Sequence, residues 1–171
     1  RYGVDAAILY SDIVVPAHAI GFGVDVTPGV GPVVSEPFRS AADLGRLRPY
    51  EPAVDAPYVG ETLRNVVADL RDAPPLIGFA GAPFTVASYL IEGRPSRTYG
   101  RTKAMMLGEP ALWHELLDRL ADMAIASLLD QVANGARAIQ LFDSWAGALS
   151  PDVYEDLVMP HSAKVFAGVA H

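Results

Sequence analysis

Residues 74–83 read Pro-Pro-Leu-Ile-Gly-Phe-Ala-Gly-Ala-Pro, a short apolar run that is closed by a turn rich in glycine and proline. The same form recurs at residues 6–12 and 138–144, where the apolar run ends in Ser-Asp and in Asp-Ser. Runs this short and this apolar are typical of parallel strands that are buried on both faces. The predicted strands are Ala6–Tyr10, Pro74–Ala80 and Ala138–Phe142.

Helical patterns lie between these strands. Residues 60–70 carry apolar side chains at helical spacing, and residues 110–134 form the clearest helix, with a proline in the first turn and Asn-Gly at the end. Ser150 is predicted to cap a further helix, with Pro151 behind it. Helices therefore alternate with the predicted strands.

The stretch from Gly21 to Pro57 is rich in glycine and proline and has little period. We interpret it as a long excursion with a small hairpin around Val24–Val34, and such long loops are more often functional than decorative. The order strand, helix, strand, helix predicts right-handed crossovers and a parallel sheet. Periodicity alone does not choose between an open sheet and a closed barrel, although the units fit a slice of an eightfold barrel at least as well as a small complete sheet.

Composition excludes several classes of function. The chain has 171 residues, enough for one domain with an apolar core, and it has no cysteine, which excludes disulfides, thiolate metal sites and a thiol nucleophile. The net charge of −7 argues against nucleic-acid binding. The four histidines show no metal-ligand spacing, so we expect no metal dependence.

Residues just past the carboxyl ends of parallel strands line the functional face of such folds. Asp12 holds this position, and it either caps the next helix, which spacing alone favours, or accepts hydrogen bonds from a ligand in a cleft. The glycine turn at residues 78–83 lacks the spacing of a phosphate-binding loop. Ser144 lacks the glycine pattern of a nucleophile elbow, so it is either a turn serine or a hydroxyl that binds a substrate carboxylate.

Three phrases carry a resemblance to a known family: residues 1–16 (Arg-Tyr-Gly-Val-Asp-Ala-Ala-Ile-Leu-Tyr-Ser-Asp-Ile-Val-Val-Pro), residues 78–93 with Gly-Phe-Ala-Gly-Ala-Pro-Phe-Thr and Ser-Tyr-Leu-Ile-Glu-Gly, and residues 140–147 (Gln-Leu-Phe-Asp-Ser-Trp-Ala-Gly). Together they resemble the uroporphyrinogen decarboxylase family over essentially the whole chain. The resemblance implies a (β/α)8 barrel in a cytoplasmic homodimer. It also implies decarboxylation, without a cofactor, of the four acetate side chains of uroporphyrinogen III to give coproporphyrinogen III.

The resemblance also implies roles for single residues. Asp12 matches the family's essential aspartate, which accepts hydrogen bonds from the central pyrrole N–H groups. Tyr89 matches a tyrosine that positions the substrate, and Ser144 matches a serine that contacts a side-chain carboxylate. Phe79 and Phe142 match apolar walls of the cleft.

Two departures from the family pattern lead to further expectations. The arginine-rich motif and the C-terminal histidine region of the family are absent, so we expect residues 1–171 to be part of a single barrel domain truncated at both ends, with little or no activity alone. Arg94-Pro95 stands where many members have a glycine pair. The alternatives are a corrinoid or thiol methyltransferase of the same barrel superfamily, against which the lack of cysteine weighs, and a non-catalytic tetrapyrrole-binding fragment.

Overall fold

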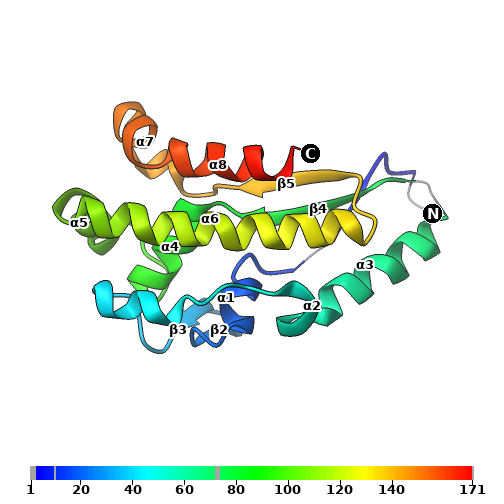
Figure 1. Cartoon of the computed structure of the whole chain (residues 1–171), viewed down its shortest axis with the longest axis horizontal. Coiled ribbons are helices and arrows are strands. Elements are labelled where there is room, and N and C mark those ends of the chain that lie inside the picture. Colours follow the sequence, from blue (N-terminus) through cyan, green and yellow to red (C-terminus); the bar gives the residue numbers. More distant parts are fainter. Residues whose placement is uncertain (1–2, 10, 72–73, 171) are drawn as a thin grey trace.

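A computed structural model describes residues 3–9, 11–71 and 74–170 (Figure 1). Arg1 and Tyr2 of the first family phrase, Tyr10 of the first predicted strand, and His171 lie outside the described residues. Three strands form a parallel sheet in the order β1-β4-β5, which confirms the predicted parallel arrangement. Their bounds are β1 Ala7–Ile8, β4 Leu76–Gly81 and β5 Ala138–Phe142.

The helices follow the predicted alternation, and most of them begin with a proline in the first turn, where the fixed φ of proline suits a helix. Ser150 does precede a helix, but its side chain makes no capping hydrogen bond. Its carbonyl instead accepts the Tyr154 N–H at 3.0 Å. The bounds are α1 Val15–Ala19, α2 Pro52–Asp55, α3 Pro57–Leu70, α4 Pro83–Glu92, α5 Gly100–Gly108, α6 Pro110–Ala133, α7 Pro151–Leu157 and α8 Met159–Val169.

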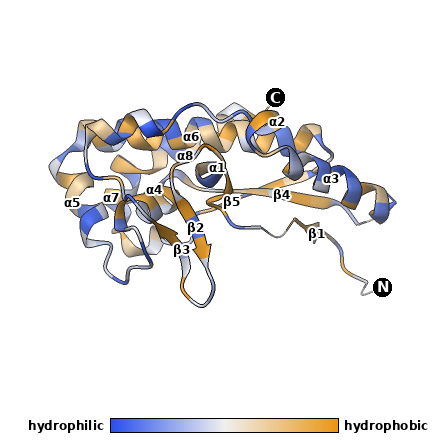
Figure 2. Ribbon diagram, turned by 90° about the horizontal axis from the view of Figure 1, so that it is seen from below, coloured by the Kyte–Doolittle hydropathy of each residue, from blue (hydrophilic) through white to orange (hydrophobic). Residues whose placement is uncertain are grey.

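Burial of the sheet differs from the prediction that the strands are buried on both faces. In β5, the exposed residues Ala138 and Gln140 alternate with the half-buried Ile139 and Leu141. Ile139 and Leu141 pack with α6 and α8, which lie along one side of the strands (Figure 2). Within the described part of the chain no helix covers the opposite face, so Ala138 and Gln140 stay open to solvent.

The excursion after α1 is a folded layer. It contains the predicted hairpin, formed by the antiparallel strands β2 (Val24–Thr27) and β3 (Gly31–Val34), and a 3₁₀ turn over Ala41–Arg46. Phe22 and Phe38 are fully buried in a core shared with α4 and α6. The excursion therefore supplies part of the main core, which burial of its aromatic side chains stabilises.

The longest helix, α6, joins the parts of the molecule. It extends along most of the molecule's length (Figure 1), and one of its faces buries Trp113, Leu116, Leu120 and Leu128. The Trp113 indole N–H donates to the Leu157 carbonyl at 2.8 Å, which fixes α6 to the end of α7. None of the helices in the described residues has the length and hydropathy of a membrane-spanning segment.

Candidate active site at the carboxyl ends of the parallel strands

The carboxyl ends of β4 and β5 are held together by a backbone hydrogen bond. The Ala82 N–H, just past β4, donates to the carbonyl of Phe142, the last residue of β5, at 2.8 Å. The rings of Phe79 and Phe142 meet edge to face, with their centroids 5.6 Å apart. Both predicted wall residues are half-buried and lie on the face of the sheet that α6 and α8 leave uncovered.

Asp12 lines a cavity of about 130 Å³ beside the end of β1. Phe79 lines the same cavity from β4, and the residues around α2 and α3 contribute Tyr50 and Tyr58. The half-buried Asp12 carboxylate accepts the Val14 N–H at 3.1 Å, so it also stabilises the start of α1. The first interpretation, a carboxylate at the start of the next helix, matches this hydrogen bond, and the second, an acceptor for a ligand, stays a prediction. The cavity as it stands is smaller than the few hundred Å³ that small-molecule sites usually occupy.

Gly81 lets the loop with Asp12 approach the end of β4. A Cβ atom at this position would lie 2.6 Å from the Val86 Cγ2 and 3.0 Å from the Ile13 Cβ. Contacts this short are not tolerated in a packed interior. A glycine is therefore required where the Asp12 loop, β4 and α4 meet.

Tyr89 belongs to an aromatic cluster next to this loop. Its ring centroid is 4.1 Å from that of Trp145, and the Tyr99 centroid is 5.0 Å from that of Trp145. Burial raises the pKa of Tyr89, and the negative charge of Asp12 raises it further. Asp12 and Tyr89 therefore share one electrostatic environment although Tyr89 does not line the cavity.

Ser144 lies in the turn after β5, where it is exposed. Its neighbour Asp143 is held by a hydrogen bond, which the Thr85 hydroxyl donates to the Asp143 Oδ1 at 2.7 Å. The same hydroxyl accepts the Trp145 N–H at 3.4 Å. Burial raises the pKa of Asp143, and the hydrogen bonds from Thr85 oppose this shift. The first turn of α4 thus holds the turn that carries Ser144 through Thr85, a residue that the sequence reasoning did not single out.

Gln131 is a second residue that the sequence reasoning missed. Its side-chain amide accepts the Phe79 N–H at 2.9 Å and donates to the Phe79 carbonyl at 2.8 Å. This pair of bonds replaces the strand partner that β4 lacks here, because β1 pairs with β4 only at Leu76 and Ile77. Gln131 is 3% exposed and lines the cavity with Asp12. The signal in the sequence was a lone amide on the apolar face of a helix.

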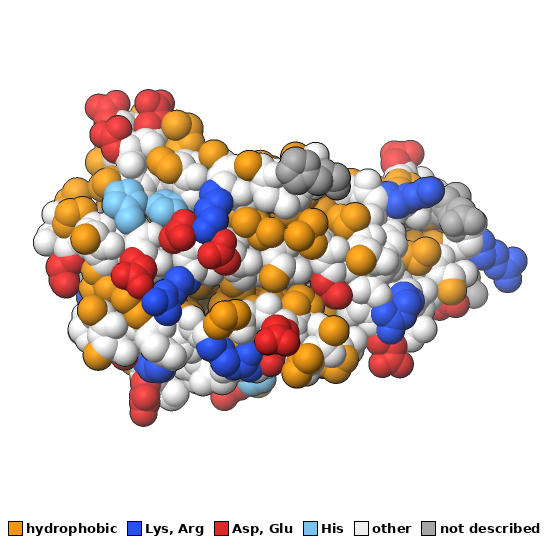
Figure 3. Space-filling model, in the orientation of Figure 1, with side chains coloured by type: hydrophobic (Ala, Val, Ile, Leu, Met, Phe, Trp, Pro, Cys, Tyr) orange, Lys and Arg blue, Asp and Glu red, His pale blue; other side chains and the backbone are white. Residues whose placement is uncertain are grey.

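Histidine side chains meet away from this site. The His114 Nδ1 lies 2.9 Å from the His161 Nε2, between α6 and α8. Figure 3 shows a histidine pair next to basic and acidic side chains, and Lys164 contacts Asp118 and Asp122 at 2.8 and 2.6 Å. Burial lowers the pKa of His161, and the neighbouring His114 adds to the shift. Within the described ranges, no three His, Cys, Asp or Glu side chains are arranged to hold a metal ion.

The sequence pattern of the family described as "Uroporphyrinogen decarboxylase (URO-D)" matches residues 1–171. The chain belongs to the uroporphyrinogen decarboxylase family. It is 59% identical over 170 residues to the "Uroporphyrinogen decarboxylase" of Streptomyces griseus, covering 99% of this chain and 46% of that protein. It is 58% identical to that of Salinispora tropica, covering 99% of this chain and 45% of that protein. The chain spans about half the length of the curated relatives it matches.

A solved structure supports the fold of this family member. A methyltransferase from Methanosarcina mazei superposes with a TM-score of 0.74 at 20% sequence identity, covering 98% of this chain and 49% of that one. At this identity the likeness concerns the fold alone. The predicted fold class, part of a (β/α)8 barrel with parallel strands and outer helices, is confirmed.

Proposed function

We propose that the protein decarboxylates the four acetate side chains of uroporphyrinogen III to give coproporphyrinogen III in tetrapyrrole biosynthesis. The observation that carries this proposal, beside the family, is the position of Asp12. Its carboxylate lies at the carboxyl end of a parallel strand, lines a cavity with Phe79 and acts electrostatically on Tyr89. Carboxylates placed this way are typical of functional sites in barrels of this kind.

The reaction needs a place for the electron pair that remains when CO₂ leaves. Protonation of the pyrrole at the α-carbon next to the ring carbon that bears the acetate gives a cation, which accepts the pair as an exocyclic methylene when the carbon–carbon bond to CO₂ breaks. A second proton then converts the exocyclic methylene to a methyl group, and loss of the first proton from the α-carbon restores the pyrrole. The substrate is its own electron sink, so the protein has to hold the ring, stabilise the cation and supply protons, and no cofactor is required.

Each site residue has a part in this scheme. Asp12 accepts hydrogen bonds from the pyrrole N–H groups, and its charge stabilises the cation most strongly where water is excluded. Tyr89 positions the macrocycle from the aromatic cluster, and the exposed hydroxyl of Ser144 binds a side-chain carboxylate. Phe79 and Phe142, in edge contact, form the apolar wall.

The cavity of about 130 Å³ beside Asp12 is too small for a macrocycle, so the scheme requires a larger site. We infer that residues 1–171 form part of a single barrel domain whose further strands enlarge this site. We also infer that the functional protein is a cytoplasmic homodimer, as the family resemblance implies. Sedimentation of the natural protein would test the dimer, and its intact mass would test the single complete barrel, which requires at least ~250 residues.

The test of the proposed function is Asp12→Asn in the full natural chain. Asparagine keeps an Oδ1 acceptor for the Val14 N–H, so the start of α1 should persist while the charge is lost. We expect turnover of uroporphyrinogen III, followed by chromatography of the oxidised porphyrins, to fall by about 100-fold or more. Asp5→Asn, which removes an exposed carboxylate before β1, is the matched control. A rate near that of the wild type for Asp12→Asn, with an unchanged circular dichroism spectrum, would refute the assigned role.

A further inference from the structure

A cleft of about 590 Å³ lies between the end of β3, the carboxyl end of α4 and the start of α5. Its lining includes four arginines, Arg39, Arg94, Arg97 and Arg101, and one acidic residue, Glu92. We call it the arginine cleft. None of the residues assigned to decarboxylation lines it, and its positive charge contrasts with the net charge of −7 of the whole chain.

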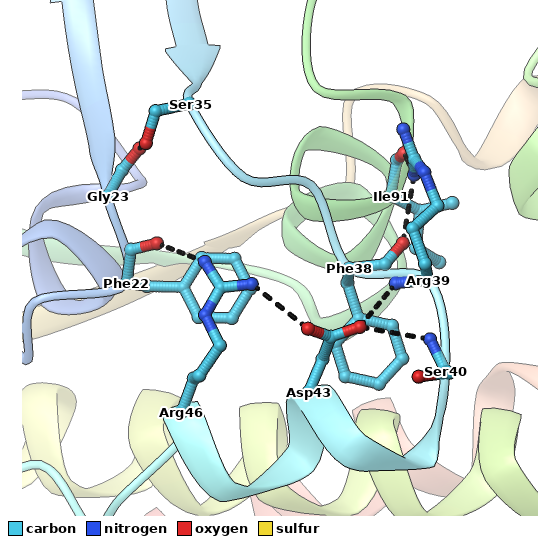
Figure 4. A network of polar contacts seen from close by, with 9 residues as sticks. All are labelled: Phe22, Gly23, Ser35, Phe38, Arg39, Ser40, Asp43, Arg46 and Ile91. Atoms are coloured by element: carbon cyan, nitrogen blue, oxygen red, sulfur yellow. Dashed lines mark hydrogen bonds and ion pairs between the residues drawn. The ribbon is translucent and has the colours of Figure 1, made fainter.

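Arg39 is anchored at one wall of the arginine cleft. Its guanidinium donates to the Phe38 carbonyl at 2.9 Å and also to the Ile91 carbonyl in the last turn of α4, and Figure 4 shows it reaching from the segment after β3 to α4. Burial lowers the pKa of Arg39, and the charge of Arg101 lowers it further, whereas the negative charges of Glu92 and Asp43 raise it. Two guanidinium groups from distant parts of the chain therefore lie close enough to repel each other.

The remaining arginines are available to a ligand. Arg94, Arg97 and Arg101 are exposed, and in the described part of the chain they form no ion pair with an acidic side chain. One carboxylate oxygen of Glu92 already accepts both the backbone N–H and the hydroxyl of Thr102 at 3.0 Å. Arg101 also lies in the first turn of α5, where the helix dipole adds positive potential.

We propose that the arginine cleft binds a small anion that carries two or more carboxylates. Four arginines line the cleft against a single acidic residue, Glu92, and an anionic ligand would relieve the repulsion between the arginines. Each guanidinium offers a planar pair of donors that matches one carboxylate. The volume is in the range of small-molecule sites and well above what a single phosphate fills, so the charges fit an anion with several separated carboxylate groups.

Binding at the arginine cleft is independent of the proposed decarboxylation, because the two sets of residues differ. The test is calorimetric titration of the full natural chain with propane-1,2,3-tricarboxylate, with acetate and inorganic phosphate as separate arms at matched ionic strength. The variant is Arg97→Gln with Arg101→Gln. The control is Arg71→Gln, which removes one positive charge just past α3, at the other end of the molecule from α5 (Figure 1).

We expect the tricarboxylate to bind more tightly than acetate or phosphate. The double substitution should weaken binding of the tricarboxylate by about tenfold or more, because each charge-assisted hydrogen bond contributes about a factor of ten. Arg71→Gln should leave the dissociation constant within about twofold, as expected for a distant charge under salt screening. Equal binding of all three anions, unchanged affinity in the double variant with an unaltered circular dichroism spectrum, or no binding heat for the tricarboxylate would each overturn the proposal.

Discussion

Gln131→Leu is the sharpest test of how the structure positions the candidate site. Leucine has a similar volume but cannot bond the Phe79 N–H and carbonyl, which Gln131 now holds at 2.9 and 2.8 Å. Each orphaned backbone group in the interior costs about 1–3 kcal/mol, so two groups give about 2–6 kcal/mol. The neighbouring cavity of about 130 Å³ has room for a water that partly replaces the amide. We therefore expect a loss of about 2–3 kcal/mol in the free energy of unfolding.

Two measurements on the full natural chain check this value. Urea denaturation gives the change in the free energy of unfolding, and hydrogen exchange reports directly on the Phe79 N–H, which should exchange faster in the variant. Ser127→Ala is the control, because it removes the Ser127 hydroxyl, 3.1 Å from the Gln131 amide nitrogen, and leaves both bonds to Phe79 intact. A loss below about 0.5 kcal/mol with unchanged Phe79 exchange would contradict the bridging role of Gln131.

Three further substitutions test other parts of the structure. Gly81→Ala should cost about 1–3 kcal/mol of stability by urea denaturation and lower the decarboxylation rate, because the new methyl group would lie 3.0 Å from the Ile13 Cβ and displace the Asp12 loop. Thr85→Val should cost about 1–3 kcal/mol, measured in the same way, because it leaves the buried Asp143 carboxylate without its hydroxyl donor. The pKa of His161 is lowered in the folded state, so the unfolded chain binds the proton more readily and the free energy of unfolding should fall as pH drops below about 6.5. His161→Asn should make this pH dependence shallower, and an unchanged slope would contradict the role of His161.

The local periodicity of apolar residues was sufficient to predict the main helices and the strands of the parallel sheet. The helix predicted over residues 110–134 is α6, Pro110–Ala133, and the strand predicted at Ala138–Phe142 has those bounds in the structure. The excursion was harder to interpret because burial of Phe22 and Phe38 depends on α4 and α6, which are remote in the sequence. The prediction that strands are buried on both faces was wrong for β5, because apolar composition does not say how many faces are covered.

The candidate site was predictable where it depends on position after a strand. Asp12 and Phe79 line the same cavity, as expected for neighbouring strand ends, but their roles stay predictions. Gln131 could not be found in this way, because its amide acts on a strand backbone 52 residues away. The arginine cleft could not be predicted from Arg94-Pro95 alone, because Arg39 and Arg101 join these residues only through the fold.

The outer edge of β5 has a consequence for handling the chain in solution. β5 pairs with β4 on one side, and no other strand within the described ranges borders its second side. Amide and carbonyl groups on such an edge recruit any extended peptide that presents complementary groups, including another copy. Expressed by itself, this polypeptide should therefore self-associate through β5, and co-expression with a polypeptide that supplies the next barrel strand should keep it monodisperse.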